Sequence, residues 1–240
     1  MRCWLALIAI TYVACDDTSA RVDAPTPPAD TVVDGPIDGP IDAPVDAAID
    51  AAIDAPPLPD LTLGYTQMAA SIFQSREAFG GSACVLNECL SQPGLRRLLR
   101  FDTMVVNQGD APLTLGAPDP DLAQWEYDSC HMHYHYVDFA NYELLDGAGN
   151  VMAVGHKQSF CLRDDRMVGE GASTPSFDCS TQGLSPGWAD IYASSLDCQF
   201  IDITDVAPGS YMLRVELNTE RTITESRYDN DVALFPVTIQ

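Results

Sequence analysis

Lysine is almost absent from this sequence. Its 240 residues include one lysine, Lys157, and four histidines, while 35 residues are acidic and the formal net charge is −23. So acidic a chain repels nucleic acid and anionic lipid and attracts cations, which argues against nucleic-acid partners. Because soluble proteins usually carry lysine on their surface, a single lysine directly after His156 in an apolar stretch is a candidate for chemistry.

The sequence also lacks, near its start, an apolar run long enough to span a bilayer. A shorter run from Cys3 to Ala14 follows a basic start and is followed by Cys15. This layout is that of a bacterial lipoprotein signal, so residues 1–15 are predicted to direct export, with Cys15 as the lipid acceptor and only membrane anchor. Ordinary secretion and an uncleaved anchor are alternatives. We expect an exported protein, either a periplasmic or cell-surface lipoprotein of the envelope or a secreted one, in a compartment where disulfides persist.

Residues 16–57 contain no aromatic side chain. Proline and like charges in this stretch oppose both a helix and a packed core. Aspartate recurs there every four residues, at Asp34, Asp38, Asp42, Asp46, Asp50 and Asp54. We expect an extended, solvated acidic stalk, with weak cation binding as the alternative. Residues 58–240 form the predicted domain, and from residue 61 onward 24 acidic and 10 basic residues leave a balance of −14.

Helical periodicity is scarce in this domain, and Leu95–Leu99 is its only helix candidate. The segment from Tyr211 to Leu217 alternates apolar and polar residues, as a half-buried strand does. Pro236 indicates that the last strand lies at an edge or bulges. Further strands are predicted at 98–106, 112–115, 131–145, 151–162, 199–203 and 232–239. The fold class is therefore predicted to be all-β, an antiparallel β-sandwich with long irregular loops.

Cysteines are few but even in number within the domain. Apart from Cys3 and Cys15 they are Cys84, Cys89, Cys130, Cys161, Cys179 and Cys198. In an exported domain six cysteines predict three disulfides, out of fifteen possible pairings. Cys84 and Cys89 are close enough in sequence to staple a local loop. Metal ligation by the thiols is the weaker alternative.

Three of the four histidines stand at alternating positions, His131, His133 and His135. On a β-strand all three imidazoles leave one face and can present three nitrogens to one ion, while Tyr134 and Tyr136 face the core. Imidazoles suit copper(II), but zinc with an open position for water would give a hydrolase. A structural metal would instead suit a non-catalytic cell-surface adhesion or binding module.

From about Pro59 onward the sequence resembles the catalytic domain of the lysyl oxidase family. The segment from Trp125 to His135 resembles the family's copper-binding segment, and that from Gly155 to Leu162 resembles the segment with its cofactor lysine. Three more matching segments follow in the family's order, at 181–187, 190–192 and 197–206.

The resemblance implies a copper(II) amine oxidase that makes its own lysine tyrosylquinone cofactor from Lys157 and Tyr192. Such an enzyme would use dioxygen to convert primary amines, lysine side chains of exported polypeptides among them, to aldehydes, releasing ammonia and hydrogen peroxide. Asp190 is a candidate base because it lies two residues before Tyr192. The implied copper ligands are His131, His133 and His135.

The resemblance also extends to a calcium site formed by the two ends of the domain. Its implied oxygen donors are Asp60, the Leu61 carbonyl, Glu225, Asn230 and Asp231, which are hard ligands of the kind calcium prefers. Arg227 stands where the family tends to have a carboxylate, which leaves calcium binding open. Asp128 replaces a histidine common in animal members, which removes a polar neighbour of the copper segment without changing the three ligands.

The family pattern further implies disulfide pairings. Cys130 and Cys179 match a pair seen in the family. Cys161 and Cys198 lack the nearby partners that animal members have, which leads to the hypothesis that they bond to each other. Such a bond would tie the Lys157 segment to the Tyr192 segment.

Overall fold

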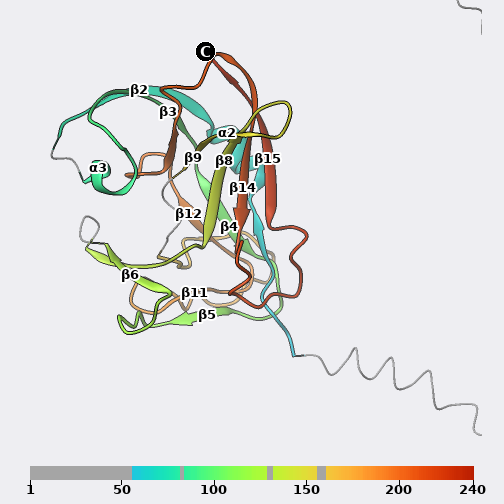
Figure 1. Cartoon of the computed structure of the whole chain (residues 1–240). Helices are drawn as coiled ribbons and strands as arrows, with labels where there is room; N and C mark the ends of the chain where they lie inside the picture. Colours follow the sequence, from blue (N-terminus) through green and yellow to red (C-terminus); the bar gives the residue numbers. More distant parts are fainter. Residues whose placement is uncertain (1–55, 82–83, 129–131, 156–160) are drawn as a thin grey trace, which may run out of the picture. The chain divides into compact units, whose positions relative to one another are not determined.

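The computed structural model describes residues 56–81, 84–128, 132–155 and 161–240 (Figure 1). These residues form antiparallel strands and two short helices, α2 (Tyr65–Ser71) and α3 (Val85–Glu88), so the all-β prediction is confirmed. None of the described helices is long and apolar enough to cross a membrane. The strands are β1 (Leu61–Leu63), β2 (Phe73–Phe79), β3 (Gly94–Arg100), β4 (Thr103–Asn107), β5 (Leu113–Gly116), β6 (Trp125–Asp128), β7 (His133–Tyr136), β8 (Ala140–Leu145), β9 (Val151–Val154), β10 (Arg166–Met167), β11 (Gln182–Leu184), β12 (Trp188–Tyr192), β13 (Phe200–Asp202), β14 (Gly209–Leu217) and β15 (Val232–Ile239).

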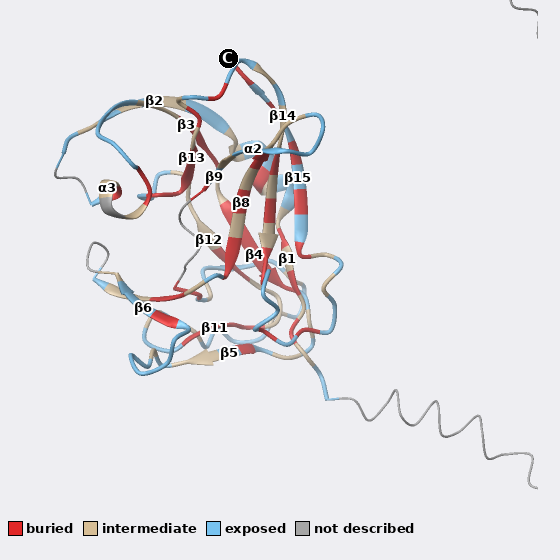
Figure 2. Ribbon diagram, viewed as in Figure 1, coloured by how far each residue is buried: buried red, intermediate tan, exposed pale blue. Residues whose placement is uncertain are grey.

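A four-stranded sheet of order β15-β14-β8-β9 carries the clearest alternation of buried and exposed residues (Figure 2). In β14, Leu213 and Val215 are fully buried, as their period-two pattern predicts. Strand β15 lies at the edge of this sheet, which confirms the prediction from Pro236. Proline lacks an N–H donor, and an edge strand can spare one.

A second sheet, of order β1-β4-β12-β10, passes through the core and positions the residues that matter below. Every residue of β4 is buried, and β12 pairs with it so that Asp190 lies opposite Val105 and Tyr192 opposite Thr103. The Thr103 hydroxyl bonds to that of the fully buried Tyr142, at 2.7 Å. This bond, with a second one from the buried Gln199 Nε2 to the Thr103 hydroxyl at 2.9 Å, satisfies the hydroxyls inside the core.

Strands β6 and β7 form a separate antiparallel hairpin. Trp125 and Tyr136 lie opposite each other on its core-facing side, and their rings meet edge to face with centroids 5.4 Å apart. Because side chains alternate along a strand, this packing leaves the histidines of β7 on the other face. The prediction that Tyr136 belongs to the core is confirmed.

Two predicted elements near residue 100 differ from the structure. The single strand expected at 98–106 is divided between β3 and β4, because the backbone N–H of Asp102 donates to the side-chain oxygen of Ser71. The helix candidate Leu95–Leu99 lies within β3, where pairing with both β2 and β13 decides the conformation. Long-range pairing outweighs such a short local pattern.

Two other long predicted strands are shorter in the structure. The segment expected at 131–145 separates into β7 and β8, because Asp138 between them has φ of 53° and interrupts the extended chain. The strand expected at 151–162 ends at Val154 among the described residues, and Gly155 continues as a single bridge to Ile201.

The disulfide from Cys89 reaches Cys198, 109 residues away in sequence. Cys84 is disulfide-bonded as well, so the predicted bond between Cys84 and Cys89 is wrong. The two cysteines flank opposite ends of helix α3, and Cys89 packs with Phe200 in a small buried cluster. Closeness in sequence therefore does not bring these two sulfur atoms together.

A second disulfide joins Cys161 to Cys179, 18 residues later. This bond overturns both the family-like pair of Cys130 with Cys179 and the hypothesised pair of Cys161 with Cys198. Cys130 itself lies outside the described residues. The chain between the bonded cysteines turns back on itself, which brings their Cα atoms to 5.4 Å, an ordinary separation for a disulfide.

Candidate metal and cofactor site

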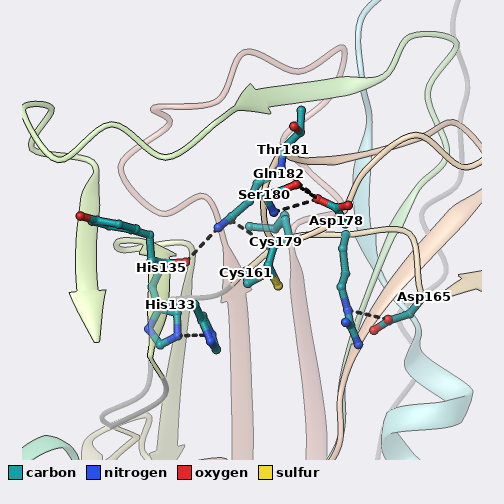
Figure 3. The surroundings of a disulfide bond; sticks show 12 residues. His133, His135, Cys161, Asp165, Asp178, Cys179, Ser180, Thr181 and Gln182 are labelled. Atoms are coloured by element: carbon teal, nitrogen blue, oxygen red, sulfur yellow. Dashed lines mark hydrogen bonds and ion pairs between the residues drawn. A yellow bond between two sulfur atoms is a disulfide. The ribbon is translucent and has the colours of Figure 1, made fainter. Parts of the chain in front are cut away.

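Two of the three predicted copper ligands, His133 and His135, are the first and third residues of strand β7. The Nε2 atoms of His133 and His135 lie 2.9 Å apart, at hydrogen-bond distance, so the two imidazoles meet through nitrogens that could bind a metal (Figure 3). At metal–nitrogen distances of about 2.0–2.1 Å, that separation corresponds to an angle of about 90° at a shared ion. His131 and His156 lie outside the described residues, and within those residues no three His, Cys, Asp or Glu side chains gather for a metal.

A carboxylate from the partner strand faces the second of these histidines. Asp128 Oδ2 lies 3.6 Å from His135 Nδ1, and both side chains are largely buried. From the sequence, Asp128 was interpreted only as the replacement of a histidine and was given no role at the metal site. The hairpin register pairs Asp128 with His133, and this places the Asp128 carboxylate within reach of His135.

Gln182 in β11 links this histidine strand to the chain around Cys161, and sequence reasoning gave it no role. Its side chain is fully buried, its amide nitrogen donates to the Tyr134 carbonyl at 2.9 Å, and its oxygen accepts from Leu162 N–H at 3.1 Å. A buried glutamine with a bond at each end fixes the distance between the two segments. The signal available in the sequence was its place in the family-like segment 181–187.

The segment around Cys161 also forms a hydrogen bond with Tyr192, the predicted cofactor tyrosine. The Tyr192 hydroxyl donates to the Cys161 carbonyl at 2.7 Å. Figure 3 shows the disulfide that joins Cys161 to Cys179. His133 and His135 lie to one side of that disulfide. Lys157, four residues before Cys161, is outside the described residues. The structure thus brings two histidines, Gln182, Cys161 and Tyr192 into one connected region.

Asp190 lies on the same strand as Tyr192, two residues away, as the extended segment predicts. Its side chain is buried, and within the part of the chain that the structure describes its Oδ2 has no hydrogen-bond partner. Burial, followed by the nearby charge of Asp165, raises the pKa of Asp190 well above its ordinary value. Asp165 in turn pairs with Arg163 at 2.8 Å and accepts the Ile191 N–H at 3.2 Å.

The same environment governs the Tyr192 hydroxyl. Burial, and then the charge of Asp190, raises the pKa of Tyr192 well above its ordinary value. The hydroxyl is therefore protonated near neutral pH, which agrees with its role as donor to Cys161.

The predicted calcium donors meet where the two ends of the domain lie side by side. Asn230 Nδ2 donates to Asp60 Oδ1 at 2.9 Å, and the Leu61 N–H donates to Glu225 Oε2 at 2.6 Å. Asn230 Oδ1 and Asp231 Oδ1 are buried and have no hydrogen-bond partner among the described residues. Asp60 therefore contacts Asn230, and Glu225 contacts the backbone of Leu61, but Asp60, Glu225 and Asp231 do not form a cluster of metal ligands among the described residues, and the calcium site stays a prediction.

Burial disfavours ionisation of the Glu225 and Asp231 carboxyls. It raises the pKa of Glu225 to about 7 and that of Asp231 to about 6, and the charge of Asp60 adds to both effects. Arg227 does not enter the cluster. Its guanidinium donates from Nε to Asp229 Oδ1 at 3.0 Å on the exposed surface.

Comparisons with known proteins support the resemblance. The model of the lysyl oxidase family matches residues 70–239. Human lysyl oxidase homolog 1 is 40% identical over 187 residues, covering 73% of this chain and 32% of that protein. Protein-lysine 6-oxidase of Rattus norvegicus is 40% identical over 189 residues, covering 73% and 45%, and the Homo sapiens enzyme is 39% identical, covering 73% and 44%.

The chain thus spans less than half the length of these relatives. Among solved structures, the CARDB domain of a Pyrococcus furiosus protein is 13% identical with a TM-score of 0.31, covering 76% of this chain and 90% of that one. A similarity this low supports no argument about fold or function.

Proposed function

The chain belongs to the lysyl oxidase family, and from that membership we propose that it is a copper-dependent amine oxidase. Its cofactor would be lysine tyrosylquinone built from Lys157 and Tyr192. It would convert primary amines to aldehydes with dioxygen, releasing ammonia and hydrogen peroxide. The observation that carries the proposal is the convergence of two histidine nitrogens in a chain that matches the family from residue 70 to 239.

The residues present fit copper(II). Imidazole nitrogen is a suitable ligand for copper, and the 2.9 Å between His133 Nε2 and His135 Nε2 fits two adjacent positions around one ion. His131, at the same spacing in sequence, would be the third ligand. Tyr192 would be oxidised to a quinone by dioxygen with the help of copper bound to these histidines, and the Lys157 amine would then join the quinone.

The surrounding residues would position Tyr192 and accept a proton from the substrate. Gln182 ties the histidine strand to the Cys161 segment, and the Cys161 carbonyl accepts the Tyr192 hydroxyl. Asp190 is the proposed base that removes a proton from the substrate carbon. Burial raises its pKa well above the ordinary value, so its carboxylate, once ionised, is a stronger proton acceptor than an exposed aspartate.

The proposed substrates are cationic amines. The domain carries 24 acidic against 10 basic residues from residue 61 onward, a field that attracts protonated amines. Lysine side chains, with an ordinary pKa of about 10.4, are protonated at neutral pH and belong to this class. Lysine residues of exported polypeptides are therefore proposed as substrates, alongside small primary amines.

Peptide mapping tests the oxidase proposal directly. The full chain would be exported with copper and air, digested, and searched by mass spectrometry for a covalently joined pair of peptides containing Lys157 and Tyr192. We expect that pair in the native chain and its loss in Lys157→Arg and Tyr192→Phe. Bound copper with separate peptides in the native chain would refute the oxidase and favour a structural or hydrolytic metal site.

We also propose that the protein reaches an oxidising compartment as a lipoprotein. The disulfides Cys89–Cys198 and Cys161–Cys179 support export. Lipid attachment at Cys15, and the division into signal, stalk and domain at residues 15 and 57, rest on the sequence alone. Metabolic labelling with a fatty acid should mark the native chain and leave Cys15→Ala unlabelled.

Calcium is the second metal that we propose for this chain. Two buried oxygens without partners, Asn230 Oδ1 and Asp231 Oδ1, beside the Asp60 and Glu225 carboxylates support a site of hard oxygen donors. In the described residues these carboxylates alone are not a metal cluster, so amide and carbonyl oxygens would complete the shell. Arg227 bonds to Asp229 on the exposed surface, although its charge still acts on Asp60.

A further inference from the structure

We propose that Asp128 is a positioning residue for the metal, holding the Nδ1–H of His135 so that Nε2 of the same ring faces the ion. The inference rests on the proposed copper site. It adds a residue that the ligand pattern does not contain and that differs from the histidine common at this position in animal members.

The hairpin register explains how Asp128 reaches its target. Glu126 lies opposite His135, and Asp128 lies opposite His133, so these four side chains share one face of the β6–β7 hairpin. Diagonal neighbours across antiparallel strands remain within reach of one another. Asp128 Oδ2 accordingly lies 3.6 Å from His135 Nδ1, with side-chain exposures of 12% and 6%.

The two nitrogens of His135 therefore face different partners. Nε2 faces the corresponding atom of His133 at 2.9 Å, whereas Nδ1 faces the carboxylate. A metal-binding nitrogen must be free of its proton, so the ring proton belongs on Nδ1 in the metal-bound state. A carboxylate beside Nδ1 favours that tautomer, orients the ring and makes Nε2 a better donor.

The 3.6 Å separation is an electrostatic contact, and a shift of well under 1 Å turns it into a hydrogen bond. A buried carboxylate at this place also adds a negative charge beside a divalent cation. A neutral histidine at the same position supplies no such charge. The geometry thus assigns to Asp128 both the orientation of one ligand and part of the charge balance of the site.

Glu126 provides a matched control within the same strand. It carries the same charge on the same face of the hairpin, but its side chain is exposed to solvent. Water screens an exposed carboxylate, so Glu126→Gln should leave the metal almost unaffected. Comparing Glu126→Gln with Asp128→Asn therefore separates a specific contact from the loss of one acidic residue.

The test measures copper(II) affinity by chelator competition, with the full chain prepared without copper and Lys157→Arg present throughout so that no cofactor forms. Asp128→Asn should weaken binding by about 10- to 100-fold. Asp128→Glu should recover most of the affinity, and Glu126→Gln should stay within about twofold of the parent. Thermal unfolding of the copper-free variants checks that each one is folded.

Spectroscopy distinguishes positioning from direct ligation. Electron paramagnetic resonance of the copper(II) form should give the same ligand signature in Asp128→Asn and in the parent. Imidazole ¹⁵N resonances of the zinc-loaded parent should show His135 protonated at Nδ1. Equal affinities for Asp128→Asn and Glu126→Gln, or loss of an oxygen ligand from the resonance spectrum of Asp128→Asn, would overturn the inference.

These outcomes are separable from failure of the proposed function. A native chain that binds copper and forms the Lys157–Tyr192 peptide pair, with Asp128→Asn binding equally well, removes only the role of Asp128. A parent that binds no copper removes the proposed site, and the role of Asp128 with it.

Discussion

In the absence of calcium, the free energy of unfolding of the domain should decrease as the pH rises. The carboxyl of Glu225 is 4% exposed, and burial raises its pKa from the ordinary value of 4.5 to about 7. Between these two values the folded state binds more protons than the unfolded state. The free energy of unfolding therefore decreases as the pH rises through this window, and the protein is more stable below it.

The magnitude follows from the same two values. Each pH unit between the folded and unfolded pKa is worth about 1.4 kcal/mol. The interval from 4.5 to about 7 therefore corresponds to a loss of about 3 kcal/mol at pH 8 relative to pH 4. Asp231 adds to the same trend, but its carboxyl interacts with that of Glu225, so the two contributions do not sum.

Calcium should abolish most of this loss, because a bound cation favours the ionised carboxylates. The assay is urea denaturation of the full chain at pH 5 and pH 8, in chelator or in millimolar calcium, followed by tryptophan fluorescence. The expected gain from calcium is larger at pH 8 than at pH 5. Arg227→Ala should not reduce this gain, because it removes only a positive charge that acts on Asp60 from outside the cluster.

Two results would contradict this reasoning. If the free energy of unfolding in chelator were the same at both pH values, the carboxyl of Glu225 would not be held in the protonated form. If calcium stabilised the chain equally at both pH values, the cation would bind elsewhere. Asp231→Asn locates the effect, because removing one of the buried carboxyls should reduce both the pH dependence and the response to calcium.

Three further substitutions probe the site and its support. Gln182→Met should slow formation of the cofactor cross-link by about tenfold at saturating copper, as measured by peptide mapping over time; an unchanged rate would remove Gln182 from the account. Asp190→Asn should leave the cross-link yield intact and lower peroxide release by at least about 100-fold, whereas near-native turnover would exclude it as the base. Gly183→Ala should cost about 2–3 kcal/mol in urea denaturation, because a Cβ there would lie 2.3 Å from the Leu113 carbonyl oxygen, while Gly147→Ala, with open space around it, serves as the neutral control.

The features predictable from the sequence are those set by local periodicity. Alternation along the strand placed His133 and His135 on one face, and it placed Leu213 and Val215 in the core. Pro236 marked an edge strand because its missing N–H is tolerated only there. Each of these inferences depends on a residue and its near neighbours.

The disulfides were not predictable in the same way. Cys84 and Cys89 are five positions apart, yet helix α3 separates them and the fold brings Cys89 to Cys198. A sulfur pair forms only where two Cα atoms come within about 4.4–6.8 Å, which is a property of the folded chain. The family pattern did not help either, because Cys161 joins Cys179 here.

The sequence by itself determined an acidic, mainly β domain with one lysine and with histidines at alternating positions of a strand. Tertiary structure alone decided which side chains complete these groups. Asp128 reaches His135 through hairpin register, Gln182 reaches Tyr134 across 48 residues, and Asn230 reaches Asp60 across 170. Side-chain periodicity is written into neighbouring residues, but strand register and long-range contacts arise from packing of the whole domain.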